Sequence, residues 1–155
     1  MRINQDKIQL NEYYTRLTDF FSRHFGNTSI PSHDLSHHNR VWMNASYLIN
    51  QMEAGPDFVF DNRKKLQVLI ACMLHDIGMA KDSGVNHGRE SRKLCEIFLH
   101  DHIPDESLHP DILIAVENHD NKKYTNIHPP DSLLTILSVA DDIDAFGFIG
   151  VYRYL

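Results

Sequence analysis

The 155-residue sequence is poor in the features that mark membrane, secreted and nucleic-acid-binding proteins. Its longest strongly apolar run covers residues 66–74, whereas a helix that crosses a bilayer needs about 20 apolar residues. Residues 1–10 are polar and lack the apolar core of a signal peptide. We therefore expect a cytosolic protein without a membrane partner. With 15 basic against 21 acidic residues and a net charge of −6, no basic face that would bind duplex nucleic acid is expected.

Cysteine is also scarce, with only Cys72 and Cys95 in the chain. They form no CxxC pair, which disfavours a cysteine-based zinc site. Both lie in apolar helical patterns, where buried free thiols are expected in a reducing compartment.

Strand-type alternation is weak throughout, and helical periodicity dominates. The pattern predicts six helices, over residues 5–25, 34–52, 61–76, 87–99, 111–119 and 131–145. Loops are expected at 28–33 and 79–86, and around the two prolines at 129 and 130. No repeat, low-complexity segment or internal boundary is present, so the prediction is a single all-α bundle over residues 1–155.

Apolar spacing also predicts which faces are buried. In the second helix the inward stripe reads Val41, Ala45, Leu48 and Met52. In the fourth helix we expect Leu94, Ile97 and Phe98 to be buried, and residues 66–74 read as a central helix covered on several sides. Residues 148–155 resemble the start of a further apolar element. They either dock on the bundle as its last element or indicate that the chain is a piece of a longer protein.

The unusual feature is eleven histidines, some of which fall on inward faces. His37 lies four residues before Val41, and His119 continues the stripe that begins at Ile112. His75 and Asp76 end the most apolar helix, and Asp141 continues an apolar stripe of the sixth.

Taken singly, each of these residues also suits a hydrogen-bonded core histidine, a helix cap or a solvated acid. Several ionisable groups aimed into one core favour a metal site, because buried charges are costly unless they are paired or bound to metal. Helical bundles build metal sites from facing helices, and two histidines with two carboxylates suit Mn, Fe, Zn or another first-row divalent ion.

Three segments carry a resemblance to a known family. Residues 37–41 (HHNRV) resemble an HxxRV motif, residues 71–78 (ACMLHDIG) an apolar-LHDIG motif, and residues 140–147 (ADDIDAFG) the ADxxDAxG of one bacterial branch, in which GxxR follows, here at 150–153. In this order they resemble the HD superfamily of metal-dependent phosphohydrolases, over about residues 30–153. The resemblance implies an HD-domain helical bundle whose metal ligands are His37, His75, Asp76 and Asp141. It selects these over His33, His38 and Asp142.

The number of ions is left open. Dinuclear members of the superfamily carry two further histidines between the HD pair and the last aspartate, and His87 and His119 fall in matching places. Asp76 would then bridge two ions. Otherwise, His87 would be a polar loop residue, and His119 would support a ligand or contact substrate.

The resemblance implies hydrolysis of a phosphoester or phosphoanhydride in a small phosphorylated substrate, for which we expect a nucleotide. One or two divalent ions (Mn, Fe, Zn, Ni, Co or Mg) would activate water. The catalytic candidates are Asp76, Asp144 and Arg40. Asp144 could hydrogen-bond a ligand histidine, orient water or act as a base, and Arg40 could instead form a structural ion pair.

The candidates for phosphate binding are Arg40, Lys81 and Lys122. Two departures from the family pattern matter for substrate binding. Met79 stands where some branches carry a lysine, and the branch with the ADxxDAxG ending continues with further helices.

Two other functions compete with hydrolysis. One is a metal- and nucleotide-binding HD domain that senses or supports without turnover, and the other is a di-iron oxygenase. The oligomeric state is left open.

Overall fold

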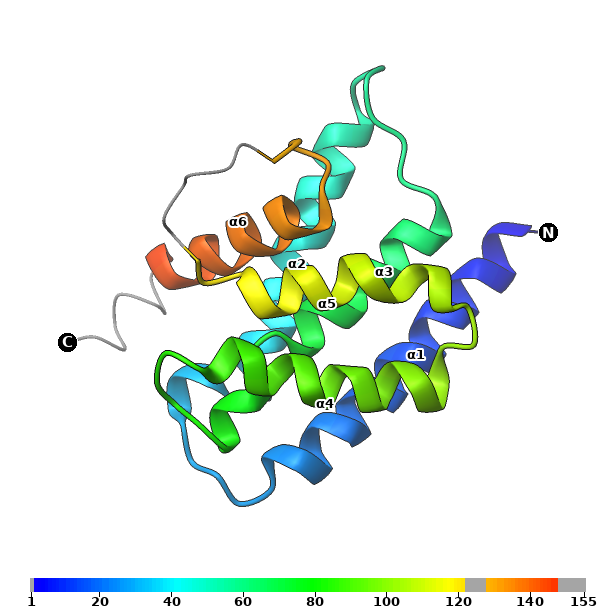
Figure 1. Ribbon diagram of the computed structural model, residues 1–155. Coiled ribbons are helices and arrows are strands. Elements are labelled where there is room, and N and C mark those ends of the chain that lie inside the picture. The colour runs from blue at the N-terminus through cyan, green and yellow to red at the C-terminus, as the bar shows by residue number, and fades with distance from the viewer. Residues whose placement is uncertain (1, 122–127, 148–155) are drawn as a thin grey trace.

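The computed structural model describes residues 2–121 and 128–147, with side chains described from residue 9 onward. Its six α-helices are α1 (Arg2–Phe25), α2 (Leu35–Glu53), α3 (Asn62–Leu74), α4 (His87–His102), α5 (His109–Asn118) and α6 (Leu133–Phe146). Three short 3-10 helices join them: η1 (Pro31–His33), η2 (Ile77–Ala80) and η3 (Glu106–Leu108). The described residues contain no strand (Figure 1), which confirms the predicted all-α bundle. None of the described helices combines the length and apolarity needed to cross a membrane.

Side-chain caps determine where three of the helices begin. The carboxylates of Asp34 and Asp61 accept hydrogen bonds from the backbone N–H groups of His37 and Lys64, and Ser132 caps α6 in the same way. Such caps satisfy N–H groups that have no partner inside the helix. The cap at Asp34 has a functional consequence, because it fixes His37 in the first turn of α2.

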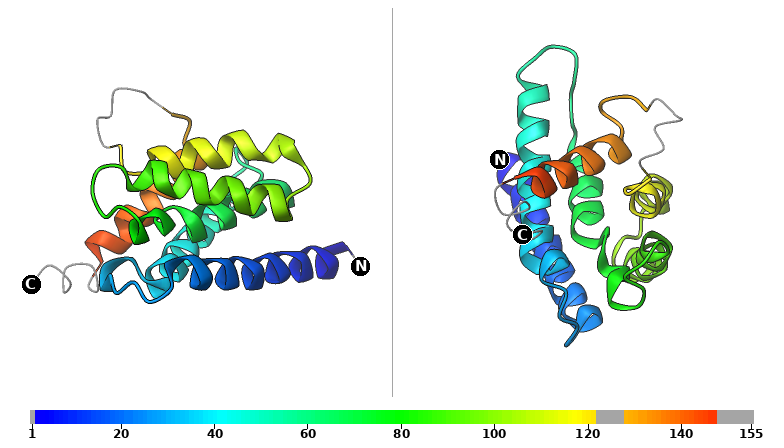
Figure 2. Two further views of the ribbon diagram at one scale, coloured as in Figure 1. Left: turned by 60° about the horizontal axis from the view of Figure 1, so that its bottom comes forward. Right: turned by 90° about the vertical axis from the view of Figure 1, so that its left-hand side faces the viewer.

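Helix α3 lies at the centre of the molecule. Every residue from Leu66 to Leu74 is buried, and α3 packs against α1, α2, α5 and α6. The right-hand view of Figure 2 shows α3 between α2 on one side and the α4–α5 pair on the other. A helix covered on several sides is apolar around its whole circumference, as predicted for residues 66–74. Cys72 and Cys95 are buried free thiols, as predicted.

Two expectations about buried faces were wrong. Ile97 is 47% exposed, because α4 packs mainly on α5 and η2 and Ile97 is turned about 100° from the buried Phe98. In α2 the buried stripe continues from Ala45 to Ile49, while Leu48 and Met52 are only half-buried.

Five chain segments meet at one end of the bundle: the start of α2, the α3–η2 junction, the start of α4, the end of α5 and the second half of α6 (Figure 1). Helices α2 and α6 pack against each other there and are joined by a hydrogen bond from Asn44 Nδ2 to the carbonyl oxygen of Ala140 at 3.1 Å. Lys122 and the segment 148–155, with its GxxR match, lie outside the described residues.

Candidate metal centre

The predicted ligands come from five segments and form one cluster of six residues: His37, His75, Asp76, His87, His119 and Asp141. His37 lies in the first turn of α2, His75 and Asp76 directly follow α3, and Asp141 lies on α6. The Nε2 atoms of His37 and His75 are 3.1 Å apart. Asp141 Oδ1 lies 3.4 Å from the first of these atoms and 3.7 Å from the second. Three residues that are far apart in the sequence thus present ligand atoms to one small space.

The two carboxylate oxygens of Asp76 face different histidines. Oδ2 lies 3.3 Å from His75 Nε2 and 3.6 Å from His37 Nε2. Oδ1 lies 3.0 Å from His119 Nε2 and 3.4 Å from His87 Nε2. His87 begins α4 and His119 follows the last residue of α5. Asp76 is therefore placed as a carboxylate between two sets of ligand atoms.

The ring orientations of these histidines are fixed from behind. The Nδ1 atoms of His75, His87 and His119 lie 2.8–2.9 Å from the carbonyl oxygens of Cys72, Gly84 and Val116. Because a carbonyl oxygen only accepts hydrogen bonds, each of these Nδ1 atoms carries a proton. His37 Nδ1 is held in the same way by Asp144 Oδ2, at 2.8 Å.

This arrangement fits a divalent metal ion. With Nδ1 protonated, the Nε2 atom of a neutral imidazole offers a lone pair, and four such lone pairs converge on the oxygens of Asp76 and Asp141. Two lone pairs that face each other at 3.1 Å repel unless a proton or a cation lies between them. Ligating histidines in metalloproteins are held by hydrogen bonds at the opposite ring nitrogen, as they are here.

The charges in the cluster point the same way. Burial works against ionisation of Asp76, but His75, His119 and His33 outweigh it and hold the pKa of this carboxyl well below its usual range. For Asp141, too, burial opposes ionisation, yet hydrogen bonding and charge from His75 lower its pKa to about 2. In the metal-free site, Asp76 and Asp141 raise the pKa of His75 well above its usual value despite the cost of burial. A proton then occupies the place that a cation would take.

Arg40 is engaged by residues behind the cluster. Its Nε and Nη2 atoms donate to the two oxygens of Asp144 at 2.6 and 3.2 Å, and Nη1 donates to Ser36 Oγ at 3.0 Å. These contacts favour the ion-pair alternative for Arg40 over phosphate binding. Asp144 is 6% exposed, and its contact with His37 Nδ1 favours the alternative of a hydrogen bond to a ligand histidine.

Lys81, another predicted phosphate contact, is not brought to the cluster by any described contact. Lys81 follows η2 with an exposed side chain, and no contact between it and the six cluster residues is found in the described part of the chain. Substrate-binding residues thus remain a prediction.

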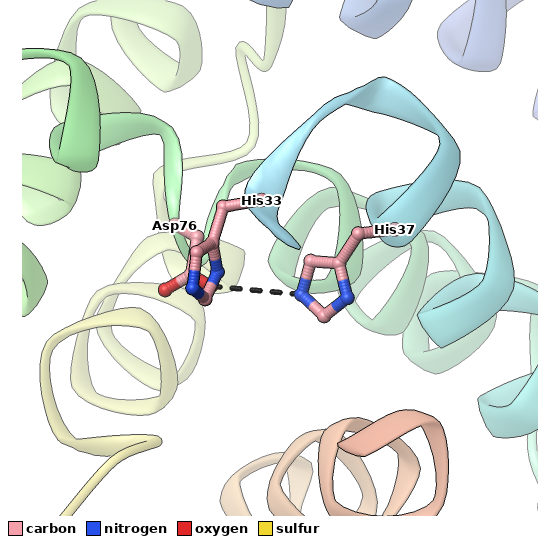
Figure 3. Close-up of side chains that lie close together, drawn as sticks. All are labelled: His33, His37 and Asp76. Atoms are coloured by element: carbon pink, nitrogen blue, oxygen red, sulfur yellow. Dashed lines mark hydrogen bonds and ion pairs between the residues drawn. The ribbon is translucent and has the colours of Figure 1, made fainter. Parts of the chain in front are cut away.

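Sequence reasoning passed over two histidines of this region. His33, at the end of η1, places Nδ1 2.6 Å from Asp76 Oδ2 (Figure 3). The loop before α2 breaks the helical period, so spacing could not reveal it. His38 is fully buried and packs against Phe21 and His75. Its Nδ1 lies 3.2 Å from the carbonyl oxygen of Cys72.

Close backbone packing positions the start of α4. A Cβ atom at Gly78 would lie 2.2 Å from the backbone nitrogen of Ser91 and 2.4 Å from the carbonyl oxygen of His87. The Gly78 N–H also donates to Ser91 Oγ at 2.8 Å. Absence of a side chain at Gly78 therefore allows η2 to approach α4 and brings His87 next to Asp76.

Comparison with known proteins gives one match. A family model described as HD domain matches residues 34–145. This span contains all six residues of the cluster and excludes His33. No curated protein and no solved structure matches the chain.

Proposed function

The chain belongs to the HD-domain family, whose members are generally metal-dependent phosphohydrolases, and from this we propose that it hydrolyses a phosphoester or phosphoanhydride, such as that of a nucleotide. The observation that carries the proposal is the convergence of imidazole lone pairs and ionised carboxylates in the cluster described above. Such a set suits a hard or borderline divalent cation, and the net charge of −6 gives no reason to expect a nucleic-acid duplex as substrate.

We place one ion between His37, His75, Asp76 Oδ2 and Asp141. A second ion would use Asp76 Oδ1 with His87 and His119. Support for the second position is that Asp76 directs one oxygen toward each group and that both additional histidines have their Nδ1 atoms fixed by carbonyl groups. When bound, the metal supplies a water molecule with a lowered pKa and polarises a phosphoryl oxygen.

The protein's own part is to hold this constellation rigid. Asp144 accepts hydrogen bonds from Arg40 and keeps the His37 ring oriented with Nε2 inward. The carbonyl groups of Cys72, Gly84 and Val116 do the same for the other rings. Fixed donors of this kind need little reorganisation as the reaction proceeds.

The side from which a substrate approaches is indicated by exposure. The side chains of His37, His75, Asp76, His87 and His119 are at most 8% exposed, whereas Asp141 is 19% exposed. His33, which contacts Asp76, is 24% exposed. We propose that the phosphoryl group reaches the cluster past Asp141 and His33.

The test combines metal analysis with a hydrolysis screen. Purified wild-type protein should retain a divalent ion and cleave a nucleotide in a panel assayed with Mn, Mg, Co, Ni, Fe and Zn. Asp76→Ala removes the carboxylate shared by both positions, so it should abolish metal retention and turnover. Asp101→Ala, an exposed acid on α4, is the matched control. If the Asp76 variant kept wild-type metal content and rate, the assignment would be wrong.

The same screen separates hydrolysis from the non-catalytic alternative. A wild-type protein that binds metal and a nucleotide, but cleaves no member of the panel with any ion, would support a sensing or structural HD domain. Metal binding would then still depend on Asp76.

A further inference from the structure

His33 is the residue that the proposed four-ligand site leaves unexplained. It lies on η1, outside α2, and precedes the span matched by the family model. Its Nδ1 atom is 2.6 Å from Asp76 Oδ2, the oxygen that faces His37 and His75. Figure 3 shows His33 and Asp76 close together, with a ring nitrogen of His37 turned toward them.

The positions of these atoms suit a common ion. His33 and His37 each offer a ring nitrogen, and Asp76 a carboxylate oxygen, that all lie within 4.8 Å of one another. In an octahedral shell with bonds of about 2.1 Å, neighbouring ligand atoms lie about 3 Å apart and opposite ones about 4.2 Å apart. His33 Nδ1 and Asp76 Oδ2 would only have to move apart from 2.6 Å to about 3 Å for His33, His37 and Asp76 to hold one ion together.

The other ring nitrogen of His33 distinguishes it from the remaining histidines. The four histidines of the cluster have Nδ1 held by a carbonyl or carboxylate group and present Nε2 to the cluster. His33 presents Nδ1, and within residues 9–121 and 128–147 no hydrogen bond of its Nε2 is found. In the metal-free chain Nδ1 donates to the ionised Asp76 Oδ2. Because Nε2 lies at the partly exposed side of the cluster without such a contact, the ring proton can move to Nε2 when a cation binds, and the Nδ1 lone pair then faces the cation.

We propose that His33 is a fifth protein ligand of the ion held by His37, His75, Asp76 and Asp141, and that it binds through Nδ1. The inference rests on the proposed function in requiring an ion at that position. Five protein ligands leave one position of an octahedral shell for water or substrate. This favours Mn, Fe, Co or Ni at this position over Zn, because Zn in structural protein sites almost always has four ligands.

Cobalt binding in solution tests the ligand. His33→Gln keeps an N–H donor for Asp76 but removes the imidazole, so it preserves a hydrogen-bonding role and destroys ligation. We expect its Kd for Co²⁺ to rise about tenfold or more. Removing a residue that only supports a metal ligand already lowers metal affinity by roughly 10–100-fold. The visible absorption of bound Co²⁺ should strengthen as the coordination number falls. His100→Gln, whose side chain is 89% exposed, should match wild type.

A crystal structure of the wild-type protein loaded with Co²⁺ decides the question without any variant. The expected result is a Co²⁺ ion about 2.1 Å from His33 Nδ1, the usual length of a metal–imidazole bond. If the ion lies on His37 and His75 while His33 Nδ1 still donates to Asp76, or if His33→Gln has the wild-type Kd and spectrum, His33 is no ligand. If wild type binds no Co²⁺, or binds it equally well after His75→Ala, the proposed metal centre itself fails.

Discussion

The Nε2 atoms of His37 and His75 face each other at 3.1 Å, although the Nδ1 atom of each ring is already held by another acceptor, Asp144 for His37 and the Cys72 carbonyl for His75. Two neutral rings arranged in this way would bring two lone pairs together. The fold therefore creates a position between the two rings that a proton or a metal ion must fill.

Asp141 and Asp142 should differ in their contribution to metal binding. Asp141 directs Oδ1 at both histidines, and Asp142 is turned about 100° from it on α6. We expect Asp141→Asn to lower metal affinity and the rate of hydrolysis by more than the roughly 10–100-fold lost when a residue supporting a ligand is removed. Asp142→Asn should largely retain both. Calorimetric metal titration and initial rates measure this, and the opposite order would show that the face of α6 is misassigned.

The number of metal ions bound per chain should depend on His119. Its Nε2 lies 3.0 Å from Asp76 Oδ1, on the side away from His37. Wild-type protein should approach two ions per chain, and His119→Ala should lower the content toward one with the helical circular dichroism unchanged. Most of the rate should be lost, because two ions together bind the attacking and leaving oxygens. One ion per fully loaded wild-type chain, unchanged in the variant, would leave only the first position standing.

Gly78 should tolerate no side chain. A Cβ atom at this position would meet backbone atoms of His87 and Ser91 at 2.2–2.4 Å, and backbone inside packed helices cannot move aside cheaply. Gly78→Ala should reduce the free energy of unfolding by at least the roughly 1–3 kcal/mol typical of overpacking, measured by urea denaturation. It should also weaken the second ion, because His87 is displaced. Gly55→Ala is the control: its nearest neighbour would be 3.6 Å away, and a change within about 0.5 kcal/mol is expected.

The stability of the metal-free protein should depend on pH in a way that metal removes. Asp76 and Asp141 raise the pKa of His75 in the folded chain. The stability contributed by its proton is therefore fully present below the unfolded value of about 6.5 and is lost as pH rises through the raised pKa. In EDTA, Tm should fall as the pH rises above about 6.5. With metal bound, the proton is displaced and this loss should disappear.

On the acid side the sign reverses. Burial, together with His75 and His37, lowers the pKa of His38 in the folded chain, so the stability from this neutral ring is lost as pH falls below about 6.5. Metal-free stability should thus peak near pH 6.5. A Tm in EDTA that stays level or rises as the pH is raised above about 6.5, or an alkaline fall that persists in His75→Gln, would contradict the assignment to His75.

Much of the fold and of the site could be predicted from the sequence, because both depend on helical periodicity. The apolar run at 66–74 predicted the central helix, and the stripes through Val41, Ile112 and Leu137 pointed His37, His119 and Asp141 toward the core. Periodicity was less reliable where a helix is covered on one side only. For that reason Ile97 was wrongly predicted to be buried: an apolar side chain one position from a buried one can still lie on the solvent side.

Only the tertiary structure decided how the ligands relate to one another. The assignment of one Asp76 oxygen to His37 and His75 and the other to His87 and His119, the engagement of Arg40 by Asp144, and the approach of His33 all depend on where separate helix ends meet. Periodicity describes the face of a single helix and does not cross a loop, so it cannot report distances between atoms on different segments. Residue types and most inward faces were therefore determined by the sequence itself, whereas the division of the proposed ligands between two positions was decided by the packing of α2, α4, α5 and α6 around the end of α3.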